Sequence, residues 1–333
     1  MSKIVCFGEL LLRMGAPGAE KLLQTPRLDV CVGGAEANVA VSLAQFGHDA
    51  VFASVVTDNV LGASAIGELR RHGVNIANIS RTPGRMGLYF LSSGAVLRAS
   101  EIVYDRADSA FATMGAEDLD WAQILDGASF LHISGITPAV GPGPAEAALR
   151  AVKAAKENGI GVSFDGNYRA QLWQAWSSDG PAILKDILRH ATIAFINERD
   201  IGLIFGRKFS PEDRKRAYSL AFREFPRLKY IANTSRTLSS VREQTLWAEI
   251  RSRDKTWESK SYALSGIVDR IGAGDAFAAG VLHALEAKSD PAHAVEFGMA
   301  ASVIKHSVPG DFNLVSSADV EALMDGGSLD VKR

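Results

Sequence analysis

The chain has 333 residues, 47% of them hydrophobic and 22% charged, which is typical of a globular protein and excludes a disordered or fibrous one. Its net charge of −2 offers no overall positive field to hold nucleic acid or an anionic membrane. Two cysteines, Cys6 and Cys31, are too few for a disulfide framework, and no apolar run reaches the roughly 18 residues that span a bilayer. We therefore expect a cytoplasmic protein with free thiols and no nucleic-acid or membrane partner.

Short apolar runs alternate with amphipathic stretches from about residue 36 onward. Each run is apolar and followed by polar or glycine residues, as buried parallel strands are; they lie at 50–55, 129–133, 161–165, 193–196 and 228–232. Helical patterns lie at 36–46, 61–72, 144–158, 181–190, 211–225, 275–287 and 291–306. The alternation predicts βαβ units in a layered α/β core.

Two regions break this alternation. Residues of about 10–32 and 87–111 have strand patterns with no helix between the strands, and the second region predicts a hairpin that turns near Ser93 and Gly94. We expect these strands to project from the core as a small β-sheet lid. A second antiparallel pair is predicted at 237–250 and 256–263.

The strongest local motif is a glycine loop that leads into a helical stretch. Gly272, Ala273 and Gly274 are followed directly by Asp275 and by good helix formers. A glycine loop at a helix N-terminus directs free N–H groups at one point, which suits a phosphate. Asp275 falls in the first turn, where the helix dipole favours its charged form. The motif predicts a carboxylate base beside a phosphate site, although a plain capping turn has the same pattern.

A second glycine motif lies near the start of the chain. Gly33 and Gly34 precede an alanine-rich helical stretch, and Asn38 falls in its first turn. Glycines allow a polyol or sugar to approach the backbone closely and to meet the Asn38 amide. Close packing of a helix on a strand would require the same small residues.

Together the two motifs resemble the signatures of the phosphofructokinase B (ribokinase-like) family of carbohydrate kinases. Residues 33–47 match its Gly-Gly-x-x-x-Asn-x-Ala signature, and residues 269–277 match its Asp-x-x-Gly-Ala-Gly-Asp-x-Phe signature. The resemblance covers essentially the whole chain. It implies one ribokinase-like domain over residues 1–333, with a three-layer α/β/α core, a mostly parallel central sheet, and a lid formed by segments of about 10–32 and 87–111.

The resemblance also implies roles for the residues of both motifs. Asp275 matches the family's catalytic base, and Gly272, Ala273 and Gly274 match the anion hole for the γ-phosphate of ATP. Positions that contact the sugar are matched by Gly33, Gly34 and Asn38.

The family's nucleotide contacts are matched less closely. Asn197 begins an element that resembles Asn-x-x-Glu near Mg²⁺ and phosphate, but Asp200 stands where Glu is usual. The expected Gly-rich nucleotide loop is replaced by a segment with Ser235 and Arg236, and Arg270 replaces the usual Thr. We expect ATP and Mg²⁺ as cofactors, with Asn197, Ser235, Arg236, Gly272 and Gly274 at the nucleotide, and assign no direct metal ligand.

Arginines and tyrosines near the expected sugar pocket point to a sugar acid. Arg106 and Arg169 would direct two guanidinium groups at one pocket, which suits a carboxylate and not a neutral sugar. The hydroxyls of Tyr89 and Tyr104 suit a polyol or ketone, and Arg13 falls where many neutral-sugar kinases have Asp. This set resembles the branch of the family that phosphorylates the terminal hydroxyl of 2-keto-3-deoxygluconate. We assign no role to Glu9.

Other functions fit less well. A kinase for another sugar or sugar acid, such as fructose or 5-dehydro-2-deoxygluconate, remains open on the same motifs. A nicotinamide-dependent dehydrogenase needs Gly-x-Gly-x-x-Gly after the first strand, which this chain lacks. A sugar-binding protein without catalysis would have no use for Asp275. We expect a homodimer or higher homo-oligomer, formed through the lid strands.

Overall fold

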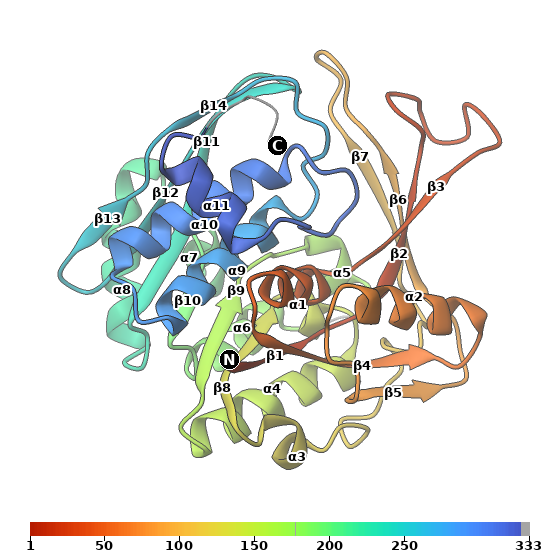
Figure 1. Ribbon diagram of the computed structural model, residues 1–333. Coiled ribbons are helices and arrows are strands. Elements are labelled where there is room, and N and C mark those ends of the chain that lie inside the picture. Colours follow the sequence, from red (N-terminus) through yellow and green to blue (C-terminus); the bar gives the residue numbers. More distant parts are fainter. Residues whose placement is uncertain (177, 328–333) are drawn as a thin grey trace.

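The structure is a computed structural model that describes residues 1–176 and 178–327 (Figure 1). A 10-stranded sheet runs through its centre, with β13-β12-β11-β10-β9-β8-β1-β4-β5 as the order of neighbours and β14 beside β12. Pairing from β5 to β11 is parallel, and β12, β13 and β14 add antiparallel pairs at one edge. The strands are β1 Lys3–Phe7, β4 Asp49–Thr57, β5 Ile79–Thr82, β8 Ala128–Ser134, β9 Gly161–Asp165, β10 Ile193–Phe195, β11 Tyr230–Ser240, β12 Glu243–Arg251, β13 Thr256–Glu258 and β14 Tyr262–Leu264.

Helices cover both faces of this sheet, and a separate hydrophobic cluster lies on each face (Figure 1). One face carries α1 Ala35–Gln45, α2 Val60–Arg71, α9 Ala273–Glu286, α10 Pro291–Lys305 and α11 Ser317–Met324. The other carries α3 Trp121–Leu125, α4 Pro142–Glu157, α5 Ala170–Gln174, α6 Gly180–Leu188, α7 Glu198–Ile204 and α8 Arg214–Glu224, with short 3₁₀ turns at Thr137–Ala139 and Pro211–Asp213. The expected three-layer α/β/α fold is confirmed.

Small residues set the position of α9, the helix that follows the glycine motif. A Cβ atom added to Gly280 of α9 would lie 2.7 Å from the Cα of Gly298 in α10, so the two helices touch through their backbones. Substitutions here would force the helices apart. This close packing fixes the helix whose N-terminus faces the cavities described below.

A separate four-stranded sheet projects from the core (Figure 1). Its order is β3-β2-β6-β7, with bounds β2 Leu11–Gly15, β3 Asp29–Gly33, β6 Gly87–Ser92 and β7 Glu101–Asp105. Three side chains of its inner face, Leu11, Tyr89 and Leu91, form a small apolar cluster that also includes Ile271 of the glycine loop. The small sheet therefore rests on the loop that precedes α9.

Three details of the sequence-based expectation are wrong. The strand expected at 237–250 is the end of β11, a turn and β12, and the one expected at 256–263 is two strands, β13 and β14. Strands β6 and β7 do pair as a hairpin, but the chain does not turn at Ser93 and Gly94: a connection of residues 93–100 joins them, with a tight turn at Ala95 and Arg98. The expected short strand at 228–232 is the start of β11, which continues to Ser240 and pairs with β12. Its outer half is exposed and polar, so its sequence lacks the pattern of a buried strand.

In the described ranges, 1–176 and 178–327, we find no helix of the length and apolar character needed to cross a membrane.

Candidate active site

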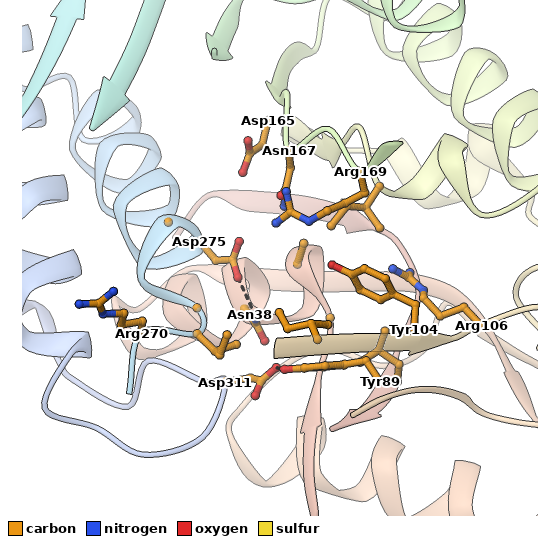
Figure 2. Close-up of a pocket in the computed structure, with 18 residues that line it drawn as sticks. Asn38, Tyr89, Tyr104, Arg106, Asp165, Asn167, Arg169, Arg270, Asp275 and Asp311 are labelled. Carbon is orange, nitrogen blue, oxygen red and sulfur yellow. Dashed lines mark hydrogen bonds between the residues drawn. The ribbon is translucent and has the colours of Figure 1, made fainter. Parts of the chain in front are cut away.

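A cavity of about 370 Å³ lies between the inner face of the small sheet, the carboxyl end of β9 and the N-terminus of α9 (Figure 2). Ligands of open α/β sheets bind at this end of the strands. The cavity is lined by Leu11, Gly34, Ala35, Asn38, Tyr89, Ile102, Tyr104, Arg106, Ile136, Asp165, Asn167, Arg169, Arg270, Ile271, Gly272, Gly274, Asp275 and Asp311. We call it the first cavity.

The start of α9 has two glycines, and the backbone requires only the first of them. Gly272 caps the helix with φ of 79°, and a Cβ there would lie 2.0 Å from the carbonyl oxygen of Asp311. A Cβ on Gly274 would meet no atom within 4 Å, so the backbone at this position is open to both cavities. The first N–H groups of a helix have no partner within the helix; here the N–H of Ala273 donates to the carbonyl of Arg270 at 3.3 Å, and Gly274 lies at the border of both cavities.

Asp275 is a buried carboxylate in contact with the first glycine motif. Its Oδ2 accepts a hydrogen bond of 2.6 Å from Nδ2 of Asn38, 237 residues away in the sequence (Figure 2). Burial raises the pKa of Asp275 to about 7, and the charges of Glu36 and Asp311 act in the same direction. The helix dipole does not keep this group as acidic as we expected, because desolvation outweighs it.

Asp165, at the end of β9, is a second carboxylate with a raised pKa. Burial and the nearby charges of Asp275 and Asp200 raise its pKa to about 8, and Arg169 partly offsets them. Its side chain still borders the first cavity, where solvent reaches it. Two neighbouring carboxyl groups whose pKa values lie near neutral pH form a site that a cation or a proton donor would stabilise.

Arg106 lines the first cavity, but its charge is already paired. Its Nε donates to Oε2 of Glu9 at 2.6 Å, Nη2 lies 2.5 Å from the same oxygen, and Ser109 donates to Oε1 of Glu9 at 2.6 Å. Both members of the ion pair are buried. The expectation of two guanidinium groups available to one anion is therefore wrong for Arg106, because Glu9, to which we assigned no role, neutralises it.

Arg169 differs from Arg106 in having no carboxylate partner. Its Nη1 donates to the carbonyl of Tyr168 at 3.2 Å, and in the part of the chain that the structure describes no carboxylate oxygen lies within 4.0 Å of its nitrogens. Figure 2 shows its side chain extending over the cavity toward Asp275. Arg169 therefore brings to this cavity a positive charge that makes no direct ion pair, although it acts through space on Asp165, Asp200 and Asp275 and lowers the pKa of each.

Arg13, which falls where many neutral-sugar kinases have Asp, does not line the first cavity. Its Nη1 lies 2.9 Å from Oδ2 of Asp269 and 3.1 Å from Oδ1 of Asp311. Tyr89 donates to Oδ2 of Asp311 at 2.7 Å. Asp269 also accepts from the backbone N–H groups of Ile271 at 3.0 Å and Gly310 at 3.1 Å. The small sheet is thus bonded through Arg13 and Tyr89 to the loops around the glycine motif.

A second cavity, of about 640 Å³, lies on the other side of the α9 N-terminus. Gly274 and Arg270 border both cavities. The second cavity is lined by Asn197, Glu198, Arg199, Pro211, Arg214, Asn233, Thr234, Ser235, Arg236, Gln244, Leu246, Trp247, Arg270, Ala273, Gly274, Met299, Ser302 and His306. Asn197 is also the N-cap of α7, where its side chain accepts from the N–H groups of Arg199 and Asp200.

The structure brings most of the predicted site residues together. Nine of them border the first cavity: Gly34, Asn38, Tyr89, Tyr104, Arg106, Arg169, Gly272, Gly274 and Asp275. Asn197, Ser235, Arg236 and Ala273 border the second. Gly33 borders neither; a Cβ there would lie 2.2 Å from Oδ2 of Asp311, so this glycine makes room for that carboxylate. Asp311 and Asn167 were not predicted, and the residues of the local motifs carry no signal for Asp311.

In residues 1–176 and 178–327, no group of three or more His, Cys, Asp or Glu side chains is arranged to hold a metal ion.

The fold and the paired cavities are those of a ribokinase-like carbohydrate kinase. The chain belongs to the pfkB family of carbohydrate kinases, whose pattern it matches over residues 1–317.

Similar proteins cover nearly the whole chain. A Haloferax volcanii protein named 2-dehydro-3-deoxygalactonokinase is 29% identical over 333 residues, which cover 100% of this chain and 99% of the relative. The crystal structure of 2-dehydro-3-deoxygluconokinase from Thermotoga maritima is 38% identical, with a TM-score of 0.91 and coverage of 98% and 100%. An Escherichia coli structure described as Ribokinase II in complex with ATP and Mg²⁺ has the same fold at 21% identity, with a TM-score of 0.83 and coverage of 98% and 100%.

We predict that Asp165→Asn stabilises the protein at alkaline pH. The folded protein keeps a proton on Asp165 up to a pKa of about 8, whereas an unfolded Asp loses it near its usual value of 3.8. The free energy of unfolding of the wild type therefore falls as the pH rises through this window. An asparagine cannot ionise and so avoids this fall. The gain is on the order of 2 kcal/mol, because water in the cavity reduces the cost of the charge.

Urea unfolding without ligands at about pH 5 and about pH 8.5 measures this difference, since the first pH lies inside the window of the shift and the second lies above it. The exposed turn residue Asp254 supplies the control, Asp254→Asn. The prediction fails if the advantage of Asp165→Asn over wild type does not grow with pH.

Proposed function

We propose that the protein transfers the γ-phosphoryl group of ATP to the terminal hydroxyl of 2-keto-3-deoxygluconate, which is 2-dehydro-3-deoxygluconate under its other name. The observation that carries this proposal is the position of Asp275, a buried carboxylate at the α9 N-terminus where two cavities meet. The names of the Haloferax and Thermotoga relatives support a substrate of this class. The product would be 2-keto-3-deoxy-6-phosphogluconate.

In this reaction Asp275 acts as the general base. Its carboxylate takes the proton of the sugar hydroxyl as that oxygen forms a bond to the γ-phosphorus and the bond from phosphorus to the ADP oxygen breaks. The N–H groups of Gly272 and Gly274 stabilise the charge on the phosphoryl oxygens. Asn38 holds the carboxylate in place through its 2.6 Å hydrogen bond. A pKa of about 7 lets Asp275 accept and release this proton at neutral pH.

The second cavity would hold ATP, with Asn197, Ser235 and Arg236 among its contacts. Mg²⁺ would arrive with the nucleotide, and its function there is to offset phosphate charge. The donor set fits a cation, because burial raises the pKa of both Asp165 and Asp200 and a cation would relieve that cost. Asp165, which borders the first cavity, is the carboxylate of this chain that would face it; Asp200 borders neither cavity, and its Oδ2 accepts from the N–H of Asn197 at the start of α7.

Arg169 is the residue that we propose to recognise the carboxylate of the sugar acid. Its guanidinium borders the first cavity and makes no direct ion pair, so a substrate carboxylate would complete a charge-assisted bond. Tyr89 and Tyr104 would contact the keto and hydroxyl groups. A family member specific for 5-dehydro-2-deoxygluconate is the alternative that the same arginine allows.

We propose that the chain is one domain whose small sheet is a lid over the substrate. The lid would exclude water from the transferring phosphoryl group, which limits hydrolysis of ATP. We also propose a cytoplasmic location, because Cys6 and Cys31 are free thiols.

We propose a homodimer or larger oligomer formed through the outer strands of the lid. Val30 on β3 and Val103 on β7 are 57% and 48% exposed, and both strands are edges of the small sheet. Light scattering should give at least twice the 35.6 kDa of one chain, and replacement of both valines by Asp should lower it. A single-chain mass for the wild type would refute this assembly.

We predict that Asp275→Asn lowers kcat by roughly 10²–10⁴-fold, because the change removes the proton acceptor and keeps nearly the same size. The wild-type rate should fall as the pH drops below about 7, since protonated Asp275 cannot act as a base, and the variant should lack this dependence. Steady-state rates across pH and calorimetric binding of the sugar acid test this. A folded variant with kcat within a few-fold of wild type would place the base elsewhere.

We predict that Arg169→Ala raises KM for 2-keto-3-deoxygluconate by roughly 10–100-fold, the value of a hydrogen bond to a charged group. Arg169→Lys should retain part of the affinity, because it keeps the charge without the planar fork. Arg189→Ala, at the exposed end of α6, serves as the control. Wild-type turnover of fructose or ribose equal to that of the sugar acid would contradict carboxylate recognition.

A further inference from the structure

Arg270 occupies an unusual place between the two cavities. It precedes the glycine loop by two residues and lines both the first and the second cavity. In Figure 2 its guanidinium lies on the opposite side of the α9 N-terminus from Asp275, away from the substrate residues. The side chain therefore presents its charge to the nucleotide side of the junction.

The charge of Arg270 is held in place without being neutralised. One terminal nitrogen donates to the backbone carbonyls of Ser240 and Val241, in the turn between β11 and β12. Within the described ranges no carboxylate oxygen lies within 4.0 Å of its nitrogens, and its Nε is buried without a hydrogen-bond partner. A buried donor with no acceptor costs free energy until a ligand supplies one.

A second arginine adds to the positive charge on this side of the junction. Arg236 borders the same cavity, and its positive charge, together with burial, lowers the pKa of Arg270. His306 also lines the second cavity and adds no negative charge there. Its Nδ1 donates to the carbonyl of Ser302, and its Nε2 pairs with Gln244. The wall is thus positive on the side that faces the glycine loop, which matches an anion with several oxygens.

We propose that Arg270 binds the terminal phosphoryl group of the nucleotide and stabilises it during transfer, acting as an arginine supplied by the chain itself. This inference rests on the proposed kinase reaction and adds to it a catalytic residue on the nucleotide side. Carbonyl partners position the guanidinium, so the charge stays available to the phosphoryl oxygens. A diphosphate lacks the terminal phosphoryl group and would not use this charge.

The turn that holds Arg270 is also attached to the small sheet. The N–H of Val241 donates to the carbonyl of Val96, in the connection between β6 and β7, at 3.3 Å. A Cβ on Gly94 of the same connection would lie 2.9 Å from Val241. The position of Arg270 is therefore set partly by contact between that connection and the β11–β12 turn.

Binding of two nucleotides tests the assignment without any sugar acid. The affinities of wild type, Arg270→Gln and Arg270→Lys for ADP and for the imido analogue of ATP, each with Mg²⁺, are measured by calorimetry. Arg270→Gln should weaken binding of the ATP analogue by roughly 10–100-fold and of ADP by less than about threefold, with Arg270→Lys between them. Arg242→Gln, an exposed arginine of the same turn that lines neither cavity, should change neither affinity.

Equal losses for both nucleotides, or no loss for either, would overturn the role of Arg270 and leave the proposed kinase reaction intact. Thermal unfolding of each variant shows whether a loss of nucleotide affinity comes from misfolding. If Arg270→Gln misfolds, the two nucleotide affinities of Arg270→Lys test the role of Arg270 instead. A wild type that prefers the ATP analogue but phosphorylates no sugar acid would refute the proposed function and support Arg270. A wild type that binds neither nucleotide would overturn both.

Discussion

Burial of the Asp275 carboxylate at the N-terminus of α9 is the constraint on which the site depends. A carboxylate loses hydration when it is buried, and the 2.6 Å hydrogen bond from Asn38 offsets part of that cost. That bond joins α1 to α9 and requires the two helices to start side by side. The glycines on either side, Gly34 and Gly272, adopt backbone angles that bring both starts to the same cavity.

Charges of both signs gather at this junction. The carboxylates Asp165 and Asp275, whose pKa values are raised, border the first cavity together with Arg169, whereas Arg236 borders the second and Arg270 borders both. The raised pKa values mean that the arginines do not fully offset the burial of the two carboxylates. A buried cluster of like charges costs stability, and such a cost is retained at sites where a ligand of the opposite charge relieves it.

Local motifs predicted more of the fold than of the charge pairing. The strands of the core were found because each is a short apolar run, and both glycine motifs were found because helix starts need particular residues. Pairing across the chain was not accessible in the same way. Glu9 neutralises Arg106 and Tyr89 bonds Asp311, contacts that span 97 and 222 residues. No local pattern states that such distant positions meet.

Errors in the strands have a similar origin. The outer half of β11 is polar because it is exposed and held by pairing with β12, so hydrophobic periodicity could not reveal its length. The β6–β7 connection contains Gly94, but that glycine serves a close approach to the backbone around Arg98 and not a two-residue turn. Glycine indicates that the backbone is unusual and does not say which neighbour makes it so.

The ion pairs of Arg13 make the small sheet a poor candidate for exchange between relatives. Arg13 belongs to β2, yet both of its carboxylate partners, Asp269 and Asp311, belong to loops of the core around α9. A chimera that took β2 and β3 from a protein without arginine at this position would leave the buried Asp311 and the partly buried Asp269 without the cation that lies between them. It would also loosen the backbone of Ile271 and Gly310, which Asp269 holds. Recombination that respects this contact must therefore transfer the small sheet and the two loops as one inherited unit.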